Sequence, residues 1–177
     1  CNLLLQKKIN INWVCSSRID AVDPELLKIM AKSGCRGICF GIETGSARIQ
    51  KSIKKNLNLS LITKIIKGCE KYNISVRLSF IIGFPEERNT DIDATLNLML
   101  RYAACHYRYI YIQLRFLAPM AGTDLFEKNK DRLTFTGFWS EMSEGPLINL
   151  EENINLIKKN PLLFSSFYIL KPKYVSI

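Results

Sequence analysis

The sequence predicts an α/β fold built on a parallel β-sheet. Stretches with the apolar pattern of strands alternate with stretches that have helical spacing, and this alternation is typical of a parallel sheet with helical crossovers. Residues 75–83 (SVRLSFIIG) are apolar at nearly every position of their second half, as expected for a strand covered on both faces. The predicted strands are residues 9–17, 36–43, 75–83 and 109–114.

The predicted helices begin at residues that favour helix N-termini. Asp23 stands before Pro24, a favourable pair for an N-cap and a first helical position. Ser46 and Ser60 precede the next two helical patterns, and a long helix follows at residues 89–104. Shorter helices are expected at residues 124–128 and 150–159.

Charged or turn-forming residues follow each of the four predicted strands. They are Arg18, Glu43, the loop at residues 83–85, and Arg115. Crossover connections are right-handed, so the carboxyl ends of these strands should emerge on one side of the sheet. Ligands bind at that side in α/β sheets. We therefore expect the four strand ends to line one rim that carries a binding site.

The chain of 177 residues suits one domain with a substantial core. It is basic, with 25 Lys and Arg against 16 Asp and Glu and a net charge of +9. A basic excess is typical of proteins that bind nucleic acid or anionic ligands. The lysines are scattered, with only short clusters such as Lys54–Lys55, so the sequence favours a compositional origin of the charge over a nucleic-acid-binding surface.

Neither a signal peptide nor a membrane span is recognisable, because no apolar run approaches about twenty residues. The six cysteines suit reduced thiols in a cytoplasmic protein better than a disulfide framework. Cys35 and Cys39 form part of a metal motif, but the next position at two-residue spacing is the apolar Ile42, which argues against a metal site. Residues 1–8 look like the end of a helix, so we expect further protein before Cys1.

The segment from Gly41 to Ser46 (GIETGS) is the strongest local candidate for a site. Glu43 stands where the predicted strand stops, and a glycine lies on either side of it. A plain strand-to-helix loop, in which Ser46 serves only as the N-cap, explains the same residues. Because three other strand ends are expected on the same rim, we favour a binding site over a plain loop.

Three segments now stand in order on successive predicted strands: GIETGS at residues 41–46, SFIIGFPEE at residues 79–87 and PMAGT at residues 119–123. Together they resemble the radical S-adenosylmethionine (SAM) enzymes over roughly residues 9–127. The resemblance is greatest to the branch of coproporphyrinogen oxidases, tRNA methylthiotransferases and cobalamin-binding radical SAM proteins. The strand that carries Trp13 and ends in SRID is similar to the cobalamin-binding branch.

The resemblance implies a partial (β/α)6 barrel at residues 1–131, to which this chain supplies the third to sixth strands, and an α-rich C-terminal extension at residues 132–177. The family's first two strands carry three cysteines spaced by three and two residues, together with a glycine-rich site for the SAM amino group. No cysteines of this chain have that spacing. We therefore expect the ligands of the [4Fe-4S] cluster outside this chain, and the chain alone to be inactive.

The resemblance also implies roles for residues at the rim. Glu43 would accept hydrogen bonds from the ribose hydroxyls of SAM, since a carboxylate accepts two bonds without offering a donor. Lys55 or Arg18 would bind the SAM carboxylate, Lys55 as a point charge and Arg18 as a bidentate fork. The structural alternatives are a solvated helix lysine for Lys55 and a salt bridge at the rim for Arg18.

Further contacts are implied on the third and fourth predicted strands. Ser79 would make a second ribose contact, or else is a strand hydroxyl bonded to backbone. Gly83 would let the backbone approach the adenine ring closely, and Pro119 would flank adenine or substrate. The residues implied for the adenine shelf are Ile81, Ile82, Gly83 and Phe84. No catalytic side chain and no metal ligand are identified.

The cofactors that the resemblance implies are SAM, a [4Fe-4S] cluster and, in the cobalamin branch, cobalamin. In such enzymes the reduced cluster cleaves SAM to a 5′-deoxyadenosyl radical, and the cobalamin branch transfers a methyl group or rearranges a ring. We expect a small-molecule or peptide substrate, and N-terminal strands or a cobalamin domain as partners. Two alternatives stay open: a tRNA-modifying relative, which the basic charge would suit, and a non-catalytic truncated barrel that acts as a binding module.

Overall fold

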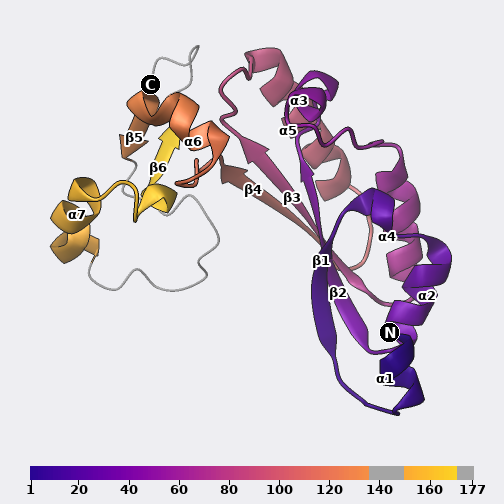
Figure 1. Ribbon diagram of the computed structural model, residues 1–177. Coiled ribbons are helices and arrows are strands. Elements are labelled where there is room, and N and C mark those ends of the chain that lie inside the picture. The colour runs from indigo at the N-terminus through magenta and orange to yellow at the C-terminus, as the bar shows by residue number, and fades with distance from the viewer. Residues whose placement is uncertain (136–149, 171–177) are drawn as a thin grey trace. The chain divides into compact units, whose positions relative to one another are not determined.

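The computed structural model describes residues 1–135 and 150–170 of the chain (Figure 1). The chain forms two compact units, and each contains segments that are distant in sequence. The first unit comprises Cys1–Phe80 and Thr90–Leu114, and the second comprises Ile81–Asn89 and Arg115–Ile177. The predicted division into residues 1–131 and 132–177 stays a prediction.

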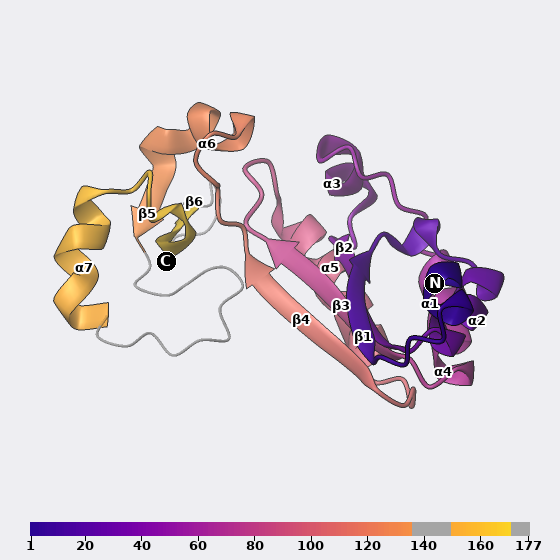
Figure 2. The ribbon, with the colours of Figure 1, turned by 60° about the horizontal axis from the view of Figure 1, so that its bottom comes forward.

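Four strands form one sheet in the order β1–β2–β3–β4. Strand β1 pairs with β2 in parallel, and so does β2 with β3. The arrows of β3 and β4 point the same way in Figures 1 and 2. The predicted α/β class with a parallel sheet is confirmed, while the number of barrel strands stays a prediction. The strands are β1 (Trp13–Ser17), β2 (Cys35–Glu43), β3 (Ser75–Ile82) and β4 (Ile110–Phe116).

Helices cover one face of this sheet. Leu27 of α2, Ile62 of α4 and Leu98 of α5 share a core with Phe40 of β2 and Phe80 of β3. The apolar residues of each helix recur at spacings of three and four, which gathers them on the side that meets the sheet. The helices of this part are α1 (Asn2–Gln6), the 3₁₀-helix η1 (Ile19–Ala21), α2 (Pro24–Lys32), α3 (Ala47–Ser52), α4 (Leu61–Lys71) and α5 (Asn89–Ala103).

The opposite face of the sheet is exposed within the described residues. Val14 of β1 follows the partly buried Trp13 and is 75% exposed. Tyr111 of β4 lies between the partly buried Ile110 and Ile112 and is 59% exposed. Side chains alternate between the two faces of a strand, so Val14 and Tyr111 point away from the helices. This uncovered face is the one that also carries the site described below.

The first strand is shorter than predicted. The prediction placed it at residues 9–17, but β1 begins at Trp13, the residue that pairs with Cys35 at the start of β2. Ile9 and Ile11 lie before this pairing and are 45% and 44% exposed. Their apolar alternation has the period of a strand, but no neighbouring strand of the described sheet extends that far to pair with them.

The predicted caps form at two of three helices. The Asp23 carboxylate accepts a hydrogen bond of 2.7 Å from an N–H of the first turn of α2. The Ser46 hydroxyl accepts from the N–H of Ile49 at the start of α3. At α4, by contrast, the Ser60 hydroxyl donates to the Asn58 side chain at 2.7 Å and makes no cap bond. The Ser60 hydroxyl, which was predicted to cap α4, is therefore bonded to Asn58 instead.

The second unit contains strands as well as helices. Strands β5 and β6 pair in antiparallel fashion, and the rings of Phe135 and Tyr168 lie 5.6 Å apart edge to face. Ile157 and Phe167 pack in the same small core. The extension predicted as α-rich thus has a β component. The elements of the second unit that follow β4 are α6 (Asp124–Asn129), η2 (Lys130–Arg132), β5 (Leu133–Phe135), α7 (Leu150–Lys159), η3 (Ser165–Phe167) and β6 (Tyr168–Leu170).

Strands of three residues are too short to show a periodicity, which is why the sequence did not reveal β5 and β6. None of the described helices is long and apolar enough to cross a membrane.

Candidate functional site

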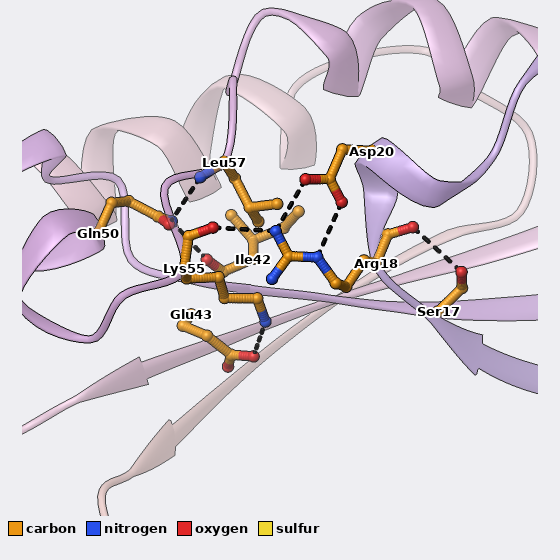
Figure 3. Close-up of polar contacts among 8 residues, drawn as sticks. All are labelled: Ser17, Arg18, Asp20, Ile42, Glu43, Gln50, Lys55 and Leu57. Carbon is orange, nitrogen blue, oxygen red and sulfur yellow. Dashed lines mark hydrogen bonds and ion pairs between the residues drawn. The ribbon is translucent and has the colours of Figure 1, made fainter.

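Glu43 is the last residue of β2, at the carboxyl end of the sheet (Figure 3). Its backbone is left-handed, with φ of 67°. The pairing with β3 shifts just before it, because Gly41 is paired with Ser79 and Glu43 with Phe80. Ile42 is therefore an extra residue in a β-bulge. Bulges of this kind re-aim side chains at functional sites.

Lys55 is the ion-pair partner of Glu43. The two side chains are only 17% and 20% exposed, so the pair is screened less than a pair on the open surface. Gly41 makes room for it: a Cβ at that position would lie 2.9 Å from the Lys55 Nζ and 3.4 Å from the Glu43 carboxyl carbon. The first glycine of GIETGS thus has a steric role on the uncovered face.

Arg18 holds the Lys55 segment from the end of β1. Its Nε and one terminal nitrogen donate to the Asp20 carboxylate at 3.0 and 2.8 Å, and that terminal nitrogen also donates to the Lys55 carbonyl at 2.9 Å. The bond from Arg18 keeps the pKa of Asp20 below its usual range and raises the pKa of Arg18. Arg18, Asp20, Lys55 and Glu43 thus form one chain of contacts (Figure 3).

Gln50 of α3 lies beneath this cluster and is 2% exposed. Its amide nitrogen donates to the carbonyls of Ile42 and Thr44, at 2.7 and 2.9 Å. Its amide oxygen accepts from the N–H of Leu57 at 3.3 Å. Neither Gln50 nor Asp20 was predicted as a site residue from the sequence. Asp20 stands two residues after Arg18, a weak signal for a pair, whereas Gln50 carries no local signal.

The loop after Glu43 is fastened to helix α5. Thr95 exchanges a 3.0 Å hydrogen bond with Thr44 and accepts another of 3.0 Å from the N–H of Gly45. A Cβ at Gly45 would lie 2.8 Å from the carbonyl carbon of Ala94. Asp91 of the same helix accepts from the Ser46 hydroxyl. The second glycine of GIETGS therefore permits close packing on α5.

The predicted ribose residue Ser79 lies beside Gly41 in the sheet and is half-buried. Partners in a parallel register share a face, so Ser79 points to the same side as the Glu43–Lys55 pair. Arg18, Lys55 and Glu43 are joined by direct contacts in the first unit, and Ser79 lies on the same face of the sheet. Of the residues predicted for one rim, Arg18 and Glu43 belong to this cluster, whereas Arg115 and the loop at residues 83–85 lie in the second unit, so the single rim stays a prediction. The roles of these residues toward SAM stay predictions.

The predicted adenine-shelf residues lie in the second unit. The Ile82 carbonyl accepts from the N–H of Leu117 at 2.8 Å, which joins the 81–84 segment to the stretch that leads to the buried Pro119. Gly83 has φ of 95°, a backbone conformation that suits glycine. The N–H groups of Gly83 and Phe84 both donate to the Glu87 carboxylate. Ile82, Gly83, Phe84 and Pro119 therefore belong to one local structure.

The cysteines do not converge on a metal site. Cys35 is fully buried in the core under the helices, while Cys39 alternates with the buried Ile38 and Phe40 and points to the other face. Burial raises the pKa of the Cys35 thiol to about 11 and that of Cys69 to about 12. Among residues 1–135 and 150–170, no three His, Cys, Asp or Glu side chains could hold a metal ion. These residues do not fit a [4Fe-4S] cluster.

The Glu43–Lys55 pair lies at the carboxyl rim of a parallel sheet, which is the side at which α/β folds bind their ligands. The family follows from comparison: the model of the Radical SAM superfamily matches residues 2–99. The chain therefore belongs to the Radical SAM superfamily, and the predicted family is confirmed.

Named relatives agree with this assignment. An uncharacterized methyltransferase of Pyrococcus horikoshii is 30% identical over 175 residues, which are 95% of this chain and 36% of that protein. The cytidylyl-2-hydroxyethylphosphonate methyltransferase of Streptomyces wedmorensis is 37% identical over 82 residues, 45% of this chain and 15% of that protein. The chain spans about a third or less of the length of these relatives.

The fold also has a counterpart among solved structures. The radical S-adenosylmethionine methyltransferase TsrM of Kitasatospora setae, with cobalamin and a [4Fe-4S] cluster bound, matches with a TM-score of 0.59. The match covers 82% of this chain and 30% of that chain at 13% identity, so it shows likeness of fold alone.

Proposed function

We propose that this chain carries the SAM-binding rim of a radical SAM methyltransferase, and that Glu43 binds the ribose hydroxyls of SAM. The observation that carries the proposal is the Glu43 carboxylate at the carboxyl end of β2, aimed to the uncovered face beside the side-chain-free Gly41. A carboxylate accepts two hydrogen bonds, which suits a pair of neighbouring hydroxyls. Ser79, the register partner of Gly41, lies on the same face and is proposed as a second ribose contact.

Lys55 is proposed to bind the carboxylate of SAM. Its ammonium already lies against Glu43 on the uncovered face, and the positive charge would attract an anionic group next to the ribose. Arg18, the alternative partner, is bonded to Asp20 and to the Lys55 carbonyl. We therefore assign Arg18 the task of holding the Lys55 segment.

For the second unit taken by itself, residues 82–84 and Pro119 are proposed to offer a surface for a planar ring such as adenine. Gly83 has no side chain, so a planar ring could approach its backbone at van der Waals distance. Ile82 and Phe84 would supply apolar contact.

The reaction class is proposed from family membership and from the methyltransferase names of the relatives. In a radical SAM enzyme a [4Fe-4S] cluster would supply the single electron that cleaves SAM, and cobalamin would carry a methyl group. We propose that residues other than those described here hold the cluster, and that the exposed face of the sheet receives a small-molecule or peptide substrate. The described residues would bind and orient SAM.

The test is reconstitution of the protein, expressed from its complete gene, with iron and sulfide. The expected results are cluster absorbance and, after reduction with dithionite in the presence of SAM, release of 5′-deoxyadenosine. The Glu43→Ala protein should keep the absorbance and lose most of the 5′-deoxyadenosine. A reconstituted wild-type protein that forms neither the cluster nor 5′-deoxyadenosine would contradict the proposal.

A further inference from the structure

We infer that Gln50 is a positioning residue that fixes Glu43 and Lys55 relative to each other for SAM, an inference that rests on the function proposed above. Gln50 is 2% exposed, so its side chain does not itself reach a ligand on the uncovered face. It acts through the main chain on both sides of the ion pair.

The first set of bonds holds the turn at Glu43. The Gln50 amide nitrogen donates to the carbonyls of Ile42 and Thr44, the residues immediately before and after Glu43. The left-handed backbone of Glu43, with φ of 67°, is unfavourable for a residue with a Cβ. Two donors from a single amide group satisfy carbonyls that this conformation directs inward, so they favour the bulged conformation over a regular strand end.

The second set of bonds holds Lys55. The main-chain carbonyl of Gln50 accepts from the N–H groups of Lys55 and Asn56 at 3.0 and 3.2 Å. The amide oxygen of its side chain accepts from the N–H of Leu57. Lys54 and Asn56 have φ of 56° and 48°, so this segment too has an unfavourable backbone that needs support. Gln50 thus bonds to the backbone of Lys55 itself and to the residues on either side of Glu43.

A buried amide is a costly way to fill a core. Burying it without partners is unfavourable, and a methionine of similar shape would fill the same space without needing any. The side-chain bonds of Gln50 all go to the two segments that carry Glu43 and Lys55. Loss of the amide should therefore misplace the carboxylate rather than simply loosen the core.

The experiment compares two unreactive ligands, S-adenosylhomocysteine and its 2′,3′-dideoxy analogue, by calorimetric titration of the protein expressed from its complete gene. Gln50→Met should lower the affinity for S-adenosylhomocysteine about tenfold, the loss expected for a misplaced hydrogen-bonding partner, and that for the dideoxy analogue by less than about twofold. The matched control is Ser33→Ala. It removes a buried hydroxyl whose 2.9 Å bond to the Met30 carbonyl is unconnected with Glu43, and it should leave the preference unchanged.

Equal losses for the two ligands in Gln50→Met, or an unchanged preference, would overturn the positioning role. Wild-type protein that binds neither ligand would instead overturn the proposed function. In that event amide hydrogen exchange decides on positioning, because it requires no ligand. Gln50→Met should speed exchange at Thr44 and Leu57 at least about tenfold relative to Ser33→Ala, and equal exchange would refute the inference.

Discussion

At the scale of single residues, we expect the Glu43 carboxylate to decide whether the rim binds an adenosyl ligand. Glu43→Ala should weaken binding of S-adenosylhomocysteine by about tenfold to a hundredfold, since a hydrogen bond to a charged group contributes about 1.5–3 kcal/mol. Calorimetric titration measures this change. Glu25→Ala is the matched control, because Glu25 lies on the exposed surface of α2 with its side chain 83% exposed. Equal affinities of the two variants would contradict the role of Glu43.

Gly41 tests the steric part of the same site. Gly41→Ala would place a methyl group against the Glu43 Oε1 and 2.9 Å from the Lys55 Nζ, so the ends of these two side chains would have to shift. We expect at least about tenfold weaker ligand binding. Gly68→Ala is a suitable control. Its Cβ would meet only the end of the Leu27 side chain, at 2.7 Å, and neither residue belongs to the chain of contacts around Glu43. If both variants bound the ligand with wild-type affinity, the absence of a side chain at Gly41 would not matter for binding.

Asp20 should make the stability of the folded protein depend on pH. The bond from Arg18 lowers its pKa below the ordinary value of 3.8, so ionised Asp20 stabilises the folded protein above that value. This contribution is lost as the pH falls through the lowered pKa. Because the pair is partly exposed, Asp20→Asn should lower the melting temperature at pH 7 by only about 1–3 °C. In thermal scans the difference from wild type should shrink below about pH 3, and a difference that grew at low pH would refute the assignment.

At the scale of elements, the loop between β2 and α3 depends on helix α5. Thr95 is fully buried and bonds to Thr44, to Gly45 and to the Asp91 carbonyl at 3.0 Å each. Thr95→Val leaves these groups without the hydroxyl and should cost about 1–3 kcal/mol in the free energy of unfolding. Urea titration measures it. Thr63→Val, which removes the 2.9 Å bond between an exposed threonine hydroxyl and the Tyr102 hydroxyl, should cost less.

The elements and the site differ in how far the sequence predicts them. Helices and the longer strands follow from local periodicity and caps, as Asp23 and Ser46 illustrate. Glu43 and Arg18 could be placed on one rim because parallel strands end on one side, whereas Lys55 was implied only by the family resemblance. Gln50 and Thr95 could not be found, since their partners depend on a bulge in β2 and on the packing of α5, which no local pattern encodes.

At the scale of the whole molecule, the proposed SAM contacts and the ligands of the proposed cluster belong to different parts of the protein. Residues 2–99 match the superfamily and contain the Glu43 rim, while the predicted adenine contacts lie in the second compact unit. The thiols at Cys35 and Cys39 point to opposite faces of β2. The described residues thus carry the proposed contacts to SAM, and the redox chemistry proposed for the family needs ligands that they do not supply.

The uncovered face of the sheet has a further consequence for the 177-residue chain studied by itself. Val14 and Tyr111 expose apolar surface there, and β1 is an edge strand of the described sheet. Exposed apolar faces next to an open strand edge promote association. We therefore expect this chain to self-associate, with an average mass in sedimentation velocity that rises with concentration.

Val14→Lys should shift that equilibrium toward the monomer by at least about tenfold, because a charge on an edge strand opposes strand pairing. Its melting temperature should stay within about 2 °C of wild type, since Val14 is already 75% exposed and its replacement removes little buried surface. Leu163→Lys is the matched control: Leu163 is 79% exposed and belongs to the second unit, not to the sheet that contains β1. If Leu163→Lys dispersed the chain as well as Val14→Lys does, association would not be specific to the uncovered face, and a wild-type chain that stayed monomeric would refute the expectation outright.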